Sequence, residues 1–141
     1  MMVNEDRKND REPIKACTVL VGEADPFMRR TLVRVLEPQY RIKFAESGAE
    51  LLELARRMKP DLIITEVLLR DRDGIQVCRE LRADPNTSRT PILVFSFLEL
   101  RDQALQAGAD AFAKKPMRRT EFFSTVEELL RRRRRSEETN P

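Results

Sequence analysis

Four side chains of types that handle ions and phosphoryl groups stand where short apolar runs of the sequence end. Glu23 follows TVLVG, Glu66 follows LIIT, Ser96 closes PILVFS, and Lys115 follows AFAK. If these runs are strands of one parallel sheet, their carboxyl ends meet at the same edge, where sites in such sheets form. Two carboxylates, a hydroxyl and an ammonium would then converge on one crevice. Each group alone would be ordinary, and their convergence indicates a functional site.

The apolar pattern that must position these groups alternates between strands and helices. Strands are predicted at 18–22, 41–45, 61–66, 91–96 and 111–114. Helices are predicted after the caps Asp25 and Ser47, after Gly74, up to Ala107, and from a cap at Thr120. Five strand-helix pairs in strict alternation require crossover connections, so they predict an α/β fold whose parallel sheet is covered on both faces.

Length and composition predict one soluble domain. The chain has 141 residues, 40% of them apolar and 36% charged, and lacks the ~20-residue apolar run that spans a bilayer. We expect a cytoplasmic protein with a disordered arm at 1–15, a domain at 16–130 and an arginine-rich tail at 131–141. Two cysteines, Cys17 and Cys78, make neither a metal cluster nor a disulfide framework.

The basic excess of the chain lies in its tail. Residues 131–141 hold five arginines and two glutamates, which accounts for the whole net charge of +3. The RRRRR run at Arg131–Arg135 could contact phosphate on nucleic acid or on an anionic membrane. The alternative interpretation is a solvated last helical turn, where cations favour the negative end of the helix dipole.

Several kinds of catalytic chemistry are excluded by residue type. The sequence has no histidine, which excludes a histidine phosphocarrier, histidine metal sites and histidine triads. Its four glycines form no phosphate-binding loop. We therefore predict that the chain is not an enzyme.

The sequence resembles the receiver domain of bacterial response regulators from about Cys17 to Leu130. The matching stretches are VLVGEADPFMRRTL, PDLIITEVLLRDRDGIQVCRELR, TPILVFS and GADAFAKKP. The resemblance implies a flavodoxin-like fold with strand order 2-1-3-4-5, an aspartyl phosphate at the end of strand three and a magnesium ion held by acids after strand one. It also implies a Ser/Thr on strand four and a lysine before proline, which Ser96 and Lys115 match. Phe112 stands where the family has an aromatic that changes rotamer on activation.

The departures from the family lie in the chemistry. The family's acidic pair after strand one is Glu23-Ala24 here, and its phosphoacceptor aspartate is Glu66. The neighbouring Asp25 is expected to cap a helix. Magnesium requires near-ideal octahedral oxygen geometry, so the loss of one acid and the lengthening of another predict weak or absent Mg²⁺ binding and no other cofactor.

The charge of this degenerate phosphoacceptor pocket also differs. A family-like pocket with three acids and one lysine stands at −2, whereas Glu23, Glu66 and Lys115 sum to −1. Arg70 or Arg72 on the adjoining loop could bring it to zero. We expect Glu66 to extend toward Lys115 or the Ser96 hydroxyl, in a partly buried pair worth ~0–1 kcal/mol.

Three functional hypotheses follow. The first is a pseudo-receiver that keeps the fold, is not phosphorylated, and acts as a protein-binding module. The second is a phosphorelay receiver with an unusual acceptor, Glu66 itself or Asp71 or Asp73, although both aspartates are expected to cap the helix that follows them. The third is an adaptor that docks on nucleic acid or an anionic membrane through its arginine tail.

The resemblance places the partner surface on helix four, strand five and helix five, and a homodimer remains an alternative. The segment between Ser96 and Lys115 is about three residues shorter than is usual in the family. Phe97 and Leu98 either cover the sheet end or plug the crevice. Of Phe122 and Phe123, one is expected in the core and the other at the edge of the exposed face.

Overall fold

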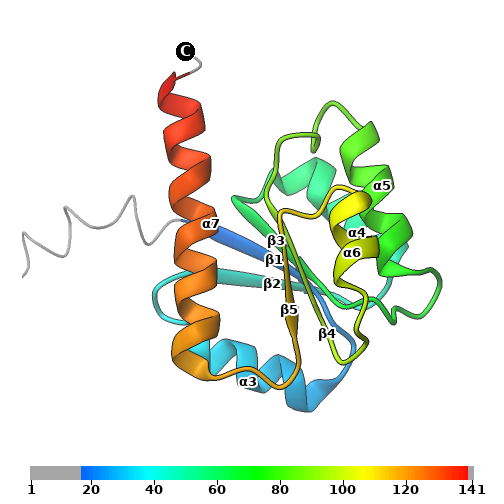
Figure 1. The fold of residues 1–141 in the computed structure, drawn as a ribbon, viewed down its shortest axis with the longest axis vertical. Coiled ribbons are helices and arrows are strands. Elements are labelled where there is room, and N and C mark those ends of the chain that lie inside the picture. Colours follow the sequence, from blue (N-terminus) through cyan, green and yellow to red (C-terminus); the bar gives the residue numbers. More distant parts are fainter. Residues whose placement is uncertain (1–16, 140–141) are drawn as a thin grey trace, which may run out of the picture.

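The computed structural model describes residues 17–139, with side chains described to residue 133. In this part of the chain, strands and helices alternate throughout (Figure 1). The strands are β1 (Thr18–Gly22), β2 (Arg41–Ala45), β3 (Leu62–Thr65), β4 (Ile92–Ser96) and β5 (Ala111–Lys114). The helices are α3 (Pro26–Leu36), α4 (Gly48–Met58), α5 (Gly74–Ala83), α6 (Arg101–Gln106) and α7 (Arg119–Thr139).

The strands form one parallel sheet in the order β2-β1-β3-β4-β5. The predicted doubly wound fold and strand order are therefore confirmed. Helices α4, α5 and α6 pack on one face and α3 and α7 on the other, giving two hydrophobic clusters separated by the sheet (Figure 1). All residues of β3 and β4 are buried, as expected for central strands covered on both faces. Strands β1, β3 and β4 therefore lie side by side in the middle of the sheet.

Local capping chemistry starts three of the helices. The Asp25 carboxylate accepts a hydrogen bond from Met28 N at 3.3 Å, and Pro26 follows at the first helical position. Ser47 caps α4 in the same way, and Asp73 caps α5. These predicted caps are confirmed. Thr120 is an exception, because α7 begins one residue earlier and places Thr120 inside the helix.

Asp71 caps a different helix from the one predicted. Its carboxylate accepts hydrogen bonds from Gly48 N at 2.6 Å and Ala49 N at 2.9 Å, both at the start of α4. The Gly48 hydrogen bond is the main reason that the pKa of Asp71 lies below its usual value. The expectation that Asp71 caps the helix following it is therefore wrong, and Asp71 instead ties the loop after β3 to α4.

The arginine-rich residues continue α7 rather than forming a separate tail. The described helix runs to Thr139 along one side of the sheet (Figure 1). Arg131 and Arg132 pair with Glu128, and Arg133 reaches Asp61 beside β3 at 2.8 Å. No helix within residues 17–139 is both long and apolar enough to cross a membrane. The arm predicted at 1–15 lies outside the described residues.

Arg82 joins the turn before β4 to the turn before β5 at the amino-terminal edge of the sheet. Its guanidinium donates to Gly108 O at 2.9 Å, to Thr90 O at 2.6 Å and to the Asp110 carboxylate at 2.7 Å. Asp110 also accepts from Ile92 N at 2.8 Å, so the network fixes the starts of β4 and β5 together. One side chain of α5 thus holds the edge opposite the strand-end groups.

Replacing Arg82 should therefore destabilise the fold. Arg82→Met removes a charged donor from several backbone carbonyls and from Asp110, and should lower the free energy of unfolding by about 2–3 kcal/mol. Urea unfolding followed by circular dichroism measures this. Arg79→Met is the matched control, since Arg79 is exposed on the same helix and contacts Gln76. Equal losses in both variants would contradict the role given to Arg82.

Candidate functional site

The site lies at the carboxyl ends of the strands, in the residues called here the strand-end site: Glu23, Ala24, Glu66, Ser96 and Lys115. Parallel pairing of neighbouring strands brings these ends to one edge of the sheet. Lys115 lies between the two acids, with its Nζ 2.7 Å from Glu23 Oε1 and 2.9 Å from Glu66 Oε2. The structure thus places Glu66 against Lys115, one of the two directions predicted.

Every carboxylate oxygen of the two acids has a donor. The second oxygen of Glu23 accepts from Asp25 N at 3.2 Å. The second oxygen of Glu66 accepts from Val67 N at 2.6 Å and, more weakly, from Leu68 N at 3.4 Å. The two acids and Lys115 therefore form a hydrogen-bonded network that needs no further group.

The network is more buried than the sequence suggested. The exposed fractions of Glu23, Glu66 and Lys115 are 6%, 7% and 4%. The expectation of a partly exposed, weak pair is therefore wrong. Buried ion pairs add little net stability over apolar residues, but removal of one partner leaves an uncompensated buried charge and is costly.

The ionisation of Lys115 follows from its partners. Burial opposes the ammonium charge and would lower the pKa, but hydrogen bonds and charges of Glu23 and Glu66 outweigh it, so the pKa is raised above its usual 10.5. Lys115 is therefore charged at neutral pH. The formal charges of Glu23, Glu66 and Lys115 sum to −1.

Two aromatic rings complete the surroundings of the ammonium. Lys115 Nζ lies 5.4 Å from the ring centroid of Phe95 and 5.3 Å from that of Phe97, within cation-π range. Phe95 is buried, whereas Phe97 is 60% exposed and Leu98 38% exposed. Phe97 thus covers Lys115 with one side of its ring and leaves the rest of its side chain in solvent.

Ser96 and Phe112 take separate positions near the site. The buried Ser96 hydroxyl accepts from Leu98 N at 3.1 Å, within its own loop. The Phe112 ring is 6% exposed and packs in the cluster beneath α4, α5 and α6. Arg101 donates to Phe112 O at 3.3 Å and places its guanidinium 5.2 Å from the ring centroid. The Phe112 side chain is therefore buried in the core, with Arg101 over its ring.

The predicted charge compensation by Arg70 or Arg72 is wrong. Arg70 lies 3.8 Å from Glu46, and Arg72 pairs with Glu80 at 2.9 Å and with Asp71 at 3.5 Å. Within the described residues, both arginines thus have partners other than the strand-end acids. The loop after β3 turns their side chains away from Glu66, and the site keeps its net negative charge.

The donor set does not match a magnesium site. Ala24 offers no side-chain oxygen, Asp25 caps α3, and both remaining acids bind Lys115. Within the described residues, no group of three acids, cysteines or histidines is placed to hold a metal ion. Magnesium needs several oxygen ligands in octahedral array, and this site does not offer them.

Arg29 is a supporting residue that sequence reasoning missed. Its Nε donates to Glu23 O at 2.6 Å, and its guanidinium lies 5.0 Å from the Phe44 ring centroid. It also lies 3.7 Å from Glu46. Arg29 thereby fixes the backbone that carries Glu23. Helical spacing from Asp25 gives the face on which Arg29 lies, but not the backbone carbonyl that it binds.

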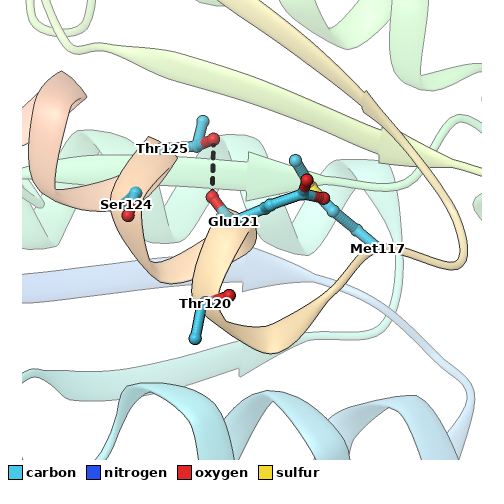
Figure 2. A pocket seen from close by; sticks show the side chains of 5 residues that line it. All are labelled: Met117, Thr120, Glu121, Ser124 and Thr125. Atoms are coloured by element: carbon cyan, nitrogen blue, oxygen red, sulfur yellow. Dashed lines mark hydrogen bonds between the residues drawn. The ribbon is translucent and has the colours of Figure 1, made fainter.

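A separate hollow of about 510 Å³ lies at the start of α7, within the surface that the family resemblance assigns to partners. It is lined by Met117, Thr120, Glu121, Ser124 and Thr125 (Figure 2). Thr125 donates to Glu121 O at 3.0 Å, as the dashed line shows. Its lining contains none of the strand-end residues.

The two adjacent phenylalanines of α7 both pack inward to different degrees. Phe122 is 3% exposed and its ring centroid is 4.6 Å from that of Phe95. Phe123 is half-buried and stacks on Tyr40 at 5.8 Å. Phe122 is therefore the core residue, and Phe123 is engaged within the fold instead of being an exposed contact.

Comparison with known proteins identifies the family. Residues 19–127 match the family model of the response regulator receiver domain. The chain belongs to that family. It is thus a receiver domain of the two-component signalling type, and the resemblance inferred from its motifs is confirmed.

The relatives show how much of a protein the match covers. The chain is 30% identical over 121 residues to the response regulator PleD of Caulobacter vibrioides, covering 84% of this chain and 27% of PleD. It is 34% identical over 118 residues to the response regulator MprA of Mycobacterium leprae, covering 81% and 51%. The chain spans at most about half the length of these relatives.

Solved receiver structures agree with the fold. The receiver domain of the sensor histidine kinase PA1611 from Pseudomonas aeruginosa, described with a magnesium ion in its active-site cleft, has a TM-score of 0.75 at 26% identity, covering 82% of this chain and 98% of that one. The receiver domain of a histidine kinase from Syntrophus aciditrophicus has a TM-score of 0.75 at 30% identity, covering 82% and 90%.

Removal of the Lys115 ammonium should destabilise the fold, because two buried carboxylates would lose their cation. Lys115→Met leaves Glu23 and Glu66 buried side by side, and should lower the free energy of unfolding at pH 7 by about 3–5 kcal/mol in urea unfolding experiments. Lys114→Met, at an exposed neighbour paired with Glu99, should change stability by less than ~1 kcal/mol. Similar losses at both positions would contradict the buried network.

The raised pKa of Lys115 also predicts that the free energy of unfolding falls at alkaline pH. Its stabilising contribution is fully present below the unfolded value of 10.5 and is lost as pH rises through the folded pKa. The free energy of unfolding of the wild type should therefore fall above pH 10.5 toward that of Lys115→Met. Curves that stay parallel above this pH would refute the assignment.

Proposed function

We propose that this receiver is a pseudo-receiver, a phosphorylation-independent protein interaction module of two-component signalling. The observation that carries the proposal is the position of Lys115, whose Nζ bridges Glu23 and Glu66 at 2.7 and 2.9 Å in a buried site. In this arrangement an internal ammonium occupies the acids that, in the family, serve metal binding and phosphoryl transfer. We place the protein in the cytoplasm, without enzymatic activity.

Glu66 is a poor phosphoacceptor for a physical reason. A carboxylate attacks a phosphodonor through an oxygen lone pair, and hydrogen bonds to both oxygens weaken Glu66 as a nucleophile. One oxygen binds Lys115 and the other accepts from Val67 N. A phosphodonor must also reach a remaining lone pair of Glu66, which is only 7% exposed. The incoming phosphoryl group would also meet a net charge of −1 that no external cation offsets.

The missing acid separates this chain from receivers that hold magnesium. The PA1611 receiver is described with the ion in its cleft, whereas Ala24 here removes one carboxylate and Lys115 engages Glu23 and Glu66. Displacement of Lys115 by a divalent ion would leave the ammonium buried without a partner. We therefore propose weak or absent Mg²⁺ binding.

The proposed partner surface comprises α6, β5 and the start of α7, which the family resemblance assigns to signalling. Two contacts hold α6 and its preceding loop to β5: Arg101 with Phe112, and Glu99 with Lys114 at 3.6 Å. Leu105 of α6 is 42% exposed. A second copy of the chain is an alternative partner for this surface.

The alternative phosphorelay receiver finds less support in the geometry. Asp71 binds the start of α4 and Asp73 caps α5, where it accepts from Ile75 N at 2.7 Å. Phosphorylation of either would remove a helix cap. Glutamyl phosphate formation at Glu66 remains the competing chemistry, and it is the one that the following experiment detects.

A phosphodonor should leave the protein unmodified. After incubation with acetyl phosphate and Mg²⁺, the intact mass should be unchanged. Fluoroberyllate with Mg²⁺ should leave the melting temperature within about 1 °C. A receiver with a complete acidic site, treated in parallel, shows that the reagents are active. A stable phosphoryl adduct or a Mg²⁺-dependent rise in melting temperature would contradict the proposal.

Restoring the lost acid should restore metal binding. The double variant Ala24→Asp with Glu66→Asp adds a carboxylate and shortens the acid at the end of β3. We expect this variant to show a melting temperature that rises with Mg²⁺, while Glu66→Asp alone shows little rise. If the single variant responds as strongly as the double, the absent acid at position 24 is not the defect.

A further inference from the structure

A small basic hollow lies at the amino-terminal edge of the sheet, opposite the strand-end site. Its volume is about 190 Å³, roughly six water molecules at ~30 Å³ each. It is lined by Arg89, Pro91, Asp110, Leu129, Arg132 and Arg133. The lining comes from the turns before β4 and β5 and from the last described side chains of α7.

Helical geometry explains why two guanidinium groups share this hollow. Leu129, Arg132 and Arg133 are spaced by three and four residues, so they lie on one face of α7. That face buries Val126 and Leu129 against the sheet. Near the edge of the sheet, this face of α7 carries arginines instead of apolar residues. Because the face points toward the domain, the two arginines also point toward it.

The ionic contacts leave positive charge available in the hollow. Asp110 is neutralised by Arg82 at 2.7 Å, and Arg133 is paired with Asp61 at 2.8 Å. The contact of Arg132 with Glu128 is exposed on both sides and is weak for that reason. Arg89 is exposed and forms no ion pair within the described part of the chain.

We infer that this hollow binds a phosphate group, with Arg89 and Arg132 as the binding guanidinium groups and Arg133 as a positioning residue. Arginine suits phosphate because its planar fork donates two parallel hydrogen bonds. The volume admits one or two linked phosphates. The basic excess of the whole chain lies in residues 131–141, so long-range attraction favours anions at this end of α7. This inference is independent of the proposed function, since it uses none of the strand-end residues.

Calorimetric titration of the full chain with inorganic pyrophosphate in 50 mM salt tests the site. Arg89→Ala and Arg132→Ala should each weaken binding about tenfold. Arg57→Ala is the matched control, because Arg57 is exposed on α4 and pairs with Glu53 four residues away, as Arg132 does with Glu128. The control should bind like the wild type. Absence of pyrophosphate binding, or equal weakening by Arg57→Ala, would overturn the inference.

Titration with a single-stranded oligonucleotide distinguishes a phosphate of nucleic acid from a free phosphate. A 20-nucleotide single strand should bind through about two phosphates if nucleic acid supplies the group, and its affinity should fall roughly sevenfold between 50 and 200 mM salt. The same two arginine variants should weaken it, and Arg57→Ala should not. Pyrophosphate binding without strand binding assigns the site to free phosphates. Strand binding that is insensitive to Arg89→Ala and Arg132→Ala counts against the hollow.

Discussion

The structure depends on one buried ammonium held between two carboxylates. Lys115 joins the end of β5 to the ends of β1 and β3, which are separated from it by β4 in the sheet. A charge this deeply buried is tolerated only when partners satisfy it, and both acids do so with every oxygen engaged. The strand order brings the three side chains together, and their charges then require the strand ends to remain together.

The same network shapes the loop after β3. Glu66 turns one oxygen back to Val67 N, and Gly74 N donates to Val67 O at 2.8 Å. At Gly74 a side chain would collide with the Glu66 carbonyl, so glycine is required by this close approach. Asp71 then fixes the middle of the loop to α4. Glu66 and the loop that follows it are therefore held in place by the same set of contacts.

Local chemistry could be predicted from the sequence, and distant partners could not. Asp25 and Ser47 cap the helices that they precede, because a cap acts over three residues. Asp71 looked like another such cap, yet its acceptor sites bind Gly48 and Ala49, more than 20 residues away. The burial of the Lys115 network was likewise missed, because Phe97 covers Lys115 only once the loop after β4 has folded over it.

An internal cation changes what can control this domain. A ligand shifts a conformational equilibrium only by its difference in affinity between two states. In a receiver with a complete acidic site, metal and phosphate supply that difference from solution. Here the cation at Glu66 is Lys115, which is part of the chain and is present whatever the concentration of metal or phosphodonor. In the same structure, Arg101 lies over the ring of the buried Phe112. Under the pseudo-receiver proposal, control would come from the amount of protein and of its partner, as for a constitutive binding surface.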